Sequence, residues 1–543
     1  MKGIGPYACI RTNEITGKSP GRCPGLLREN EKEKHMVFDT ILRGGTVIDG
    51  SGRPGFTADV AFLDGKIAAV GDLSGAQAKR TLDVAGKLVT PGFLDIHRHA
   101  DAAVFRPGFG EAELFQGLTT IVNGNCGLSI APSGGAFQKE IFDYLTPVTG
   151  PIEARMQPES MASYLQAVKT LALPLNVGML VGGGTVRAQA AGFGVQRLEG
   201  AHYTAIHKAL EQALSDGALG VSLGLGYAPE CFYTTQELIR ALAPLQNSGV
   251  PVTVHMRQEG SGVVDALREM IAVGKALHTP IEISHLKSIG RENWRKATPL
   301  MLQLMQAARE DGVEINADAY PYTAGSTQLI HILPPECQEG GLDALSENLK
   351  DPAFRAKLRR RMETGRDFEN ISLLVGWDNI VASSVIRPED RAYEGKTIAE
   401  IAKMQGKDPY DCAFDLLSGE HCAISMIDFI TAEEDIEAIL RDDTTCVISD
   451  STYPTHGLLH PRVYGTYARL FERYVRQRGT ISVEKAVRKV TSLPAKRLRL
   501  AAKGRIAPGM DADVNVFALE RLHEAATYDH PDLHERGMEH VFL

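Results

Sequence analysis

Helix-like and strand-like segments alternate through the middle of this 543-residue chain. Apolar residues recur at helical spacing over residues 203–214, and the short apolar run Leu219-Gly-Val-Ser-Leu follows them. The same pairing returns further along, with predicted strands at 250–255, 281–285 and 313–318. Repetition of a helix and a strand is typical of a parallel sheet with helical crossovers, so the sequence predicts an α/β fold.

Eight strands of this kind can be nominated along the chain. Eight in succession favour a (β/α)8 barrel of the TIM type over a doubly wound sheet, which the strand count disfavours. The active site of such a barrel lies at the carboxyl ends of its strands. The predicted strands end near His97, Cys126, Gly182, Ser222, His255, His285, Asp318 and Asp450.

Both ends of the chain are predicted to form β-strands, and they flank the predicted barrel. Residues 39–49 and 59–70 alternate and break at Gly and Asp, as hairpins do, and residues 504–517 do the same. We expect residues 37–91 and 503–543 to form one small β-sandwich domain.

The barrel itself is predicted to span residues 92–502. Residues 323–444 are far too long for a plain crossover, so they are predicted to hold a lid-like insertion. Residues 1–36 are polar and rich in Gly, Pro and charge, which predicts a disordered tail.

Composition narrows the classes of partner and compartment. A net charge of -9 and a pI of about 6.0 give no reason to expect nucleic acid or an anionic membrane. No apolar run is long enough to span a bilayer, and the first 36 residues lack the apolar core of a signal peptide. The 8 cysteines form no CxxC pair, which favours a reducing compartment. We therefore expect a cytoplasmic protein that acts on a small molecule, with its oligomeric state left open.

The first predicted strand closes with two histidines, in Asp95-Ile-His-Arg-His. Alternation along a strand places residues two apart on one face, so the imidazoles of His97 and His99 can reach one metal ion. A bare pair of this kind is as often two ordinary surface histidines. The preceding Pro91-Gly-Phe-Leu marks the exit of a barrel strand and favours the metal site.

Other strand ends carry three further candidates. His255 ends the fifth predicted strand and His285 the sixth. A lone histidine at a strand end is more often packed or solvated than a ligand, but two at equivalent ends of one barrel indicate a shared site. Asp450 ends the eighth strand, where a carboxylate either caps the following loop or contacts the metal and transfers protons.

Together these residues resemble the amidohydrolase superfamily, and within it the D-aminoacylases, which are N-acyl-D-amino-acid deacylases. The resemblance runs from about residue 39 to the end of the sequence. Its motifs are Gly117-Leu-Thr-Thr-Ile-Val-Asn-Gly-Asn-Cys-Gly-Leu-Ser-Ile-Ala-Pro, Thr253-Val-His-Met-Arg-Gln-Glu, Ser284-His-Leu-Lys, Asp318-Ala-Tyr-Pro-Tyr-Thr-Ala-Gly-Ser-Thr and His460-Pro-Arg-Val-Tyr-Gly-Thr.

The resemblance implies a cysteine ligand at the end of the second strand, where many amidohydrolases use a carbamylated lysine. A thiolate is a natural zinc ligand, and the alternative for Cys126 is a buried structural cysteine. The family pattern also implies one tightly bound Zn²⁺ and a second, weaker metal position. The tight site takes Cys126, His255 and His285, and the weaker position takes His97, His99 and Asp450.

Three further residues match the family's positions that hold the α-carboxylate of the substrate: Lys287, Tyr320 and Arg462. Two cations and a phenol are a chemically sensible set for an anion. Tyr227, in Gly224-Leu-Gly-Tyr, is placed either near the scissile carbonyl or in a packing role.

The resemblance implies zinc-dependent hydrolysis of N-acyl-D-amino acids, with Asp450 as the catalytic proton carrier. One alternative is a cyclic-amide hydrolase, similar to hydantoinases or dihydropyrimidinases, which Cys126 in place of a carbamylated lysine disfavours. The other is a catalytically silent barrel that serves as a scaffold. Proteins of that kind usually lose metal ligands, and all six candidates are present in this sequence.

Overall fold

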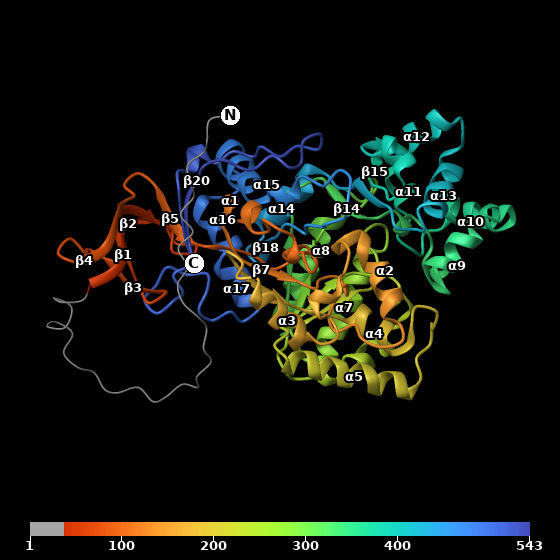
Figure 1. Ribbon diagram of the computed structural model, residues 1–543, viewed down its shortest axis with the longest axis horizontal. Coiled ribbons are helices and arrows are strands. Elements are labelled where there is room, and N and C mark those ends of the chain that lie inside the picture. The colour runs from red at the N-terminus through yellow and green to blue at the C-terminus, as the bar shows by residue number, and fades with distance from the viewer. Residues whose placement is uncertain (1–36) are drawn as a thin grey trace.

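The computed structural model describes residues 37–543, so the predicted disordered tail lies outside the described residues. The strands from the two chain ends lie at one end of the molecule, and most of the insertion lies at the opposite end (Figure 1). Parallel strands and their helices form the body between them (Figure 1). Within the described range, no helix combines the length and hydropathy that a membrane-spanning helix needs.

Strands from both chain ends form one sheet, which has seven strands in the described part of the chain. β1, β2 and β3 pair as antiparallel neighbours, and β4 and β5 pair with β1 in parallel. The C-terminal strands join through β5. The strands are β1 (Val37–Val47), β2 (Phe56–Leu63), β3 (Lys66–Gly71), β4 (Gln77–Asp83), β5 (Leu88–Pro91), β19 (Val514–Phe517) and β20 (Met538–Phe542).

The body contains two parallel sheets, of three and six strands within residues 37–543. All of their neighbouring strands run parallel, and most of their residues are buried, which confirms the predicted α/β fold. The first sheet holds β6 (Phe93–Asp95), β7 (Leu118–Asn123) and β8 (Asn176–Met179). The second holds β9 (Val181–Gly182), β10 (Val221–Gly224), β11 (Val252–His255), β12 (Ile281–Ile283), β13 (Ile315–Ala319) and β18 (Thr445–Val447).

Backbone hydrogen bonds connect these two sheets. The residue between β8 and β9, Leu180, donates its N–H to Asn123 O at 2.9 Å, so β8 and β9 continue one another beside β7. At the opposite edges, beyond β18 and β6, Asp450 N–H donates to His97 O at 2.9 Å. The first and last parallel strands therefore lie side by side.

Helices fill the connections between the parallel strands. In α7 (Val263–Leu277), buried Val263, Leu267 and Met270 form the apolar face, with Asp265 in the first turn and Lys275 in the last, as the helix dipole favours. The other helices of the body are α1 (Glu111–Phe115), α2 (Gln138–Thr149), α3 (Met161–Thr170), α4 (Gly183–Ala191), α5 (Gly200–Ser215), α6 (Thr235–Ala241), α8 (Ala297–Glu310), α14 (Glu433–Arg441), α15 (Arg462–Arg469), α16 (Val483–Val490) and α17 (Ser492–Arg497).

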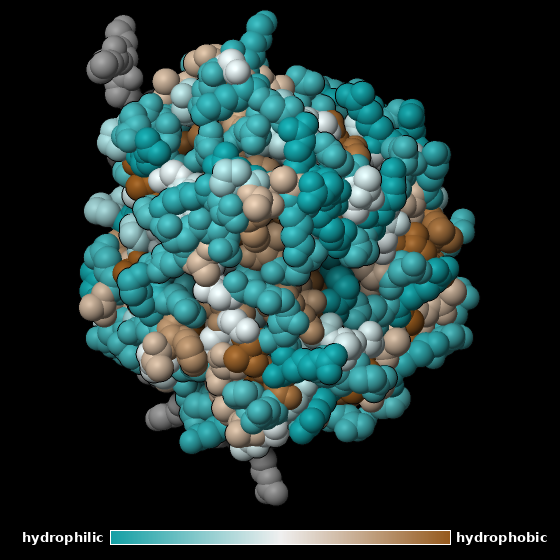
Figure 2. Space-filling view, turned by 90° about the vertical axis from the view of Figure 1, so that its right-hand side faces the viewer, coloured by the Kyte–Doolittle hydropathy of each residue, from teal (hydrophilic) through white to brown (hydrophobic). Residues whose placement is uncertain are grey.

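The long segment between β13 and β18 folds around a hydrophobic core of its own, in which Leu329, Phe414 and Met426 are fully buried. The face of the molecule at this end is mostly hydrophilic, with scattered hydrophobic patches (Figure 2). Its sheet and helices are β14 (Ala324–Gln328), β15 (Ile380–Ser384), β16 (Lys396–Thr397), β17 (Ser425–Phe429), α9 (Gly341–Asn348), α10 (Pro352–Thr364), α11 (Ile371–Val375), α12 (Ile398–Gln405) and α13 (Pro409–Gly419).

Candidate metal centre and active site

The carboxyl ends of the parallel strands bring the six predicted metal-site residues to one place. Each lies at the last residue of a strand or within four residues after it, and all six are buried. His97 and His99 follow β6, Cys126 follows β7, His255 closes β11, His285 follows β12 and Asp450 follows β18.

Three of these residues have left-handed backbone conformations: φ is 53° at Cys126, 38° at His285 and 53° at Asp450. A non-glycine residue pays about 1–3 kcal/mol for this conformation, and such residues cluster at functional sites. The turn at these positions also ends the strands early, because β12 stops at Ile283 and β18 at Val447. The sequence predicted both strands two to three residues longer.

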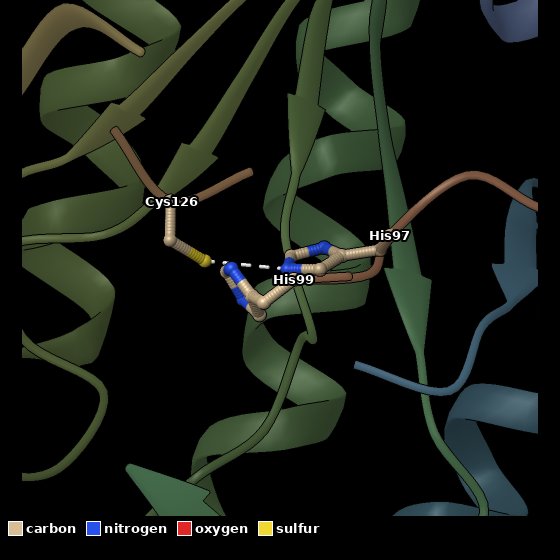
Figure 3. A group of neighbouring side chains, drawn as sticks. All are labelled: His97, His99 and Cys126. Carbon is tan, nitrogen blue, oxygen red and sulfur yellow. Dashed lines mark hydrogen bonds between the residues drawn. The ribbon is translucent and has the colours of Figure 1, made fainter. Parts of the chain in front are cut away.

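Two overlapping groups of side chains can each hold a metal ion, and Cys126 belongs to both. Cys126 Sγ lies 3.2 Å from His97 Nε2 and 3.4 Å from His285 Nε2. His255 Nδ1 lies 3.1 Å from His285 Nε2. In the group of His97, His99 and Cys126, the side chains point toward one another (Figure 3). The ligand atoms of each group all lie within 4.8 Å of one another.

The protonation states of His255 and His285 fit a metal ion. Burial lowers the pKa of His255 and of His285 well below the ordinary value, so both imidazoles are neutral and offer a lone pair. Burial raises the pKa of the Cys126 thiol to about 11, so a thiolate there needs a cation beside it. One sulfur and two imidazole nitrogens are a donor set that suits zinc.

Asp450 lies between the histidines and the predicted carboxylate-binding residues. One of its oxygens is 3.3 Å from His99 Nε2 and 3.4 Å from His97 Nε2, and the other is 3.0 Å from Arg462 Nη1. Burial alone would raise the pKa of Asp450, but the Arg462 guanidinium and the hydrogen bond from His99 hold it well below its usual range.

The three residues predicted to bind a carboxylate also meet. The Arg462 guanidinium lies 4.8 Å from the centre of the Tyr320 ring, and Lys287 Nζ lies 5.7 Å from it. All three side chains are buried. The structure thus places two cations and a phenol beside the candidate metal centre.

Comparisons with known proteins identify the family of the chain. The family model described as "Amidohydrolase family" matches residues 80–543. The chain is 33% identical to the D-aminoacylase of Alcaligenes xylosoxydans xylosoxydans over 509 residues, 93% of each chain. The chain belongs to the D-aminoacylase family of amidohydrolases. The predicted family and enzyme class are thereby confirmed.

Other members of the D-aminoacylase family are equally similar. An N-acyl-D-glutamate deacylase of the same organism is 33% identical over 514 residues, 93% of this chain and 92% of the relative. The structure of the Bordetella bronchiseptica N-acyl-D-glutamate deacylase, complexed with zinc and a phosphonate inhibitor, superposes with a TM-score of 0.79 at 30% identity, covering 93% and 95%. An Arthrobacter aurescens L-hydantoinase shares the fold at 15% identity and a TM-score of 0.53.

Two buried carboxylates at the metal centre were not predicted as site residues. Glu259 Oε1 lies 2.9 Å from His285 Nδ1, and Asp318 Oδ2 lies 3.4 Å from His97 Nδ1. A carboxylate that accepts the Nδ1–H of an imidazole fixes the ring and leaves Nε2 free for a metal. Position was the available signal, because Asp318 lies near the carboxyl end of β13 and Glu259 follows β11. The candidate ligands lie at the same ends of the neighbouring strands.

Lys287 shares this hydrogen-bonding system. Its Nζ lies 2.8 Å from both oxygens of Glu259 and 2.7 Å from His285 Nδ1. An ammonium only donates hydrogen bonds, so it competes with Glu259 for this ring nitrogen. Metal binding through Nε2 requires a proton on Nδ1 of His285, and Nδ1 then donates its hydrogen bond to Glu259. Lys287 in turn donates to Glu259 and not to the imidazole.

Tyr227 packs directly against a candidate ligand. Its ring centroid lies 4.2 Å from that of His255 on one side and 4.2 Å from that of His331 on the other. Its hydroxyl lies 3.4 Å from Thr327 Oγ1 of β14. Tyr227 therefore connects the candidate metal centre to the insertion.

Proposed function

We propose that this protein is a zinc-dependent hydrolase that cleaves the amide bond of N-acyl-D-amino acids, giving a carboxylate and a free D-amino acid. One observation carries the proposal. A candidate metal site of sulfur and imidazole donors lies on one side of Asp450, and a buried group suited to a carboxylate lies on the other side. The similarity to D-aminoacylase and N-acyl-D-glutamate deacylase supports the same substrate class.

The proposed architecture is a closed (β/α)8 barrel with a small β-sandwich domain. The hydrogen bond from Asp450 N to His97 O supports closure between the last and first strands, and the one from Leu180 N to Asn123 O supports it between the two parallel sheets. The insertion at the barrel mouth is proposed as a lid, since Tyr227 and Thr327 join it to the site. The free cysteines of the described chain support a reducing, cytoplasmic environment.

Cys126, His255 and His285 would hold one zinc tightly, and His97, His99 and Asp450 would surround a second, weaker position. When bound, zinc lowers the pKa of a water molecule toward neutrality and polarises the acyl carbonyl. Glu259 and Asp318 keep the rings of His285 and His97 oriented for this role.

Asp450 is the proposed proton carrier. It accepts the proton of the attacking water and returns it to the departing nitrogen, so that no covalent intermediate with the protein is needed. Arg462, Lys287 and Tyr320 hold the α-carboxylate, which fixes where the side chain of the substrate must point and so selects the D-enantiomer. A carboxylate bound at Arg462 weakens the hold of this arginine on Asp450, so substrate binding increases the affinity of Asp450 for a proton.

Amine release from paired N-acetyl-D- and N-acetyl-L-amino acids tests the proposal. We expect hydrolysis of the D-substrates alone, and loss of activity when zinc is removed by exhaustive chelation. Equal turnover of L-substrates, or full activity without metal, contradicts it. Turnover of hydantoins in place of linear amides would favour a cyclic-amide hydrolase, and a purified protein without metal or activity would favour a silent scaffold.

Replacement of Arg462 by alanine is expected to cost roughly 2–5 kcal/mol of transition-state stabilisation, because a charged hydrogen bond in a buried site is lost. The loss is measured as a lower kcat/KM for N-acyl-D-amino acids. The corresponding amides, which lack the α-carboxylate, should lose much less. Parallel measurement of kcat/KM for both substrate types checks this. Equal losses would mean that Arg462 acts only through the fold or through Asp450.

Tyr320→Phe is the matched control for this experiment, because it removes a hydroxyl and leaves the Arg462–Asp450 ion pair in place. Loss of one hydrogen bond to a charged group costs about 1.5–3 kcal/mol, and the loss should again fall on substrates with the α-carboxylate.

A further inference from the structure

Asp428 is a buried carboxylate on the sheet of the insertion. It lies on β17 opposite Gly325 of β14, and opposite residues of an antiparallel pair point to the same face. Thr327, two residues further along β14, shares that face, and its hydroxyl contacts Tyr227. Because Tyr227 stacks on His255, Asp428 lies on the face of the sheet that is turned toward the metal centre.

Gly325 leaves room for Asp428 to reach the proposed substrate site. A Cβ atom at Gly325 would stand 2.9 Å from Asp428 Oδ1 and 3.3 Å from the Tyr320 hydroxyl. Both atoms therefore occupy the space next to this glycine, which any larger residue would fill. Since Tyr320 is proposed to contact the α-carboxylate, Asp428 lies beside the bound amino acid.

Asp428 has no cation of its own in the described chain. Lys287 pairs with Glu259 at 2.8 Å, and Arg462 pairs with Asp450 at 3.0 Å. Among residues 37–543, Asp428 forms no ion pair and its side chain accepts no hydrogen bond from another residue, although it is only 2% exposed. Burial raises its pKa to about 6, so it is ionised at neutral pH. Its own backbone N–H donates to it, and the charges of Lys287 and Arg462 lower its pKa. A buried anion without an ion-pair partner is still costly, which indicates that a ligand supplies this partner.

The similarity to relatives does not decide the side chain of the substrate, because D-aminoacylase and N-acyl-D-glutamate deacylase are equally close. We propose that Asp428 binds a positively charged substrate side chain, so that the preferred substrates are N-acyl derivatives of basic D-amino acids. This inference rests on the proposed function. An ammonium or guanidinium group forms a charge-assisted hydrogen bond with a carboxylate.

The same charges disfavour an acidic side chain. A second carboxylate on the substrate is repelled by Asp428, and both nearby cations already have partners. His331, stacked on Tyr227, supplies no charge, because burial lowers its pKa to about 3. The described site thus has one position for a carboxylate and one for a cation.

The test compares kcat/KM for N-acetyl-D-lysine, N-acetyl-D-norleucine and N-acetyl-D-glutamate. Norleucine has the carbon chain of lysine without its ammonium group. We expect the wild-type enzyme to prefer D-lysine over D-norleucine by about tenfold to a hundredfold, the value of a hydrogen bond between charged groups. D-glutamate should be the poorest substrate. Inhibition by the free products D-lysine and D-norleucine should show the same preference, which separates binding from turnover.

Asp428→Asn keeps the size of the side chain and removes its charge. It should abolish the preference for N-acetyl-D-lysine and raise kcat/KM for N-acetyl-D-glutamate. The value of kcat/KM for N-acetyl-D-norleucine should stay within about threefold of the wild type. Asp378→Asn, the same change at an exposed position of the insertion, should alter none of these rates.

Each outcome decides a different point. If D-norleucine is hydrolysed as well as D-lysine by the wild-type enzyme, or if Asp428→Asn changes all three substrates equally, the role of Asp428 is wrong while the deacylase function stands. If no N-acyl-D-amino acid is hydrolysed, the proposed function fails first and this inference fails with it.

Discussion

Replacement of Cys126 by alanine should remove the tightly bound zinc and reduce activity to background. Cys126 is 1% exposed and contributes its sulfur to both candidate metal groups, so its loss weakens both positions at once. Its left-handed backbone, φ 53°, is a local strain that alanine can also adopt at similar cost. Loss of a ligand is local, and the fold should persist because the strands around it are buried by apolar contacts.

The measurement is zinc per chain together with kcat and the thermal unfolding midpoint. Cys412→Ala is the matched control, since Cys412 is equally buried but lies in α13, in the core of the insertion. That variant should keep its zinc and its activity. A Cys126→Ala protein with the zinc content and rate of the wild type would return Cys126 to the role of a buried structural cysteine.

The alternation of elements along the chain was predictable because it is local. In a helix such as α7 or a strand such as β11, the spacing of apolar residues within the element indicates its type. The change from one spacing to the next indicates about where each strand ends. His255 and His285 could be named as candidate ligands for that reason. The role of Cys126 could not be derived in this way, because a lone buried cysteine has no period, and it came from the resemblance.

The carboxylates around the ligands were harder to predict. Glu259 and Asp318 contact His285 and His97, residues 26 and 221 positions away, and no spacing in the sequence encodes such pairs. Asp428 is harder still. Its place depends on the register of β17 against β14 and on the missing side chain of Gly325, which only the folded insertion reveals.

Asparagine in place of Asp450 is expected to lower kcat by about 10²–10⁴-fold, the usual contribution of one general acid–base group. The substitution keeps the size and shape of the side chain, so contacts with His99 and Arg462 can persist. An amide cannot accept the proton of the attacking water, and this is the step that should fail. Zinc should stay bound, because Asp450 belongs to neither group of three ligands found around Cys126.

The combined measurement is kcat and zinc per chain for Asp450→Asn, with Asp378→Asn as a control at an exposed position. Near-normal kcat would exclude proton transfer by Asp450. Loss of zinc in parallel with activity would make Asp450 a principal ligand instead. The ion pair with Arg462 adds a second expectation, because an uncharged residue 450 holds the guanidinium less strongly. KM for N-acyl-D-amino acids should then fall or stay level while kcat drops, which is the signature of a lost catalytic group over an intact carboxylate-binding site.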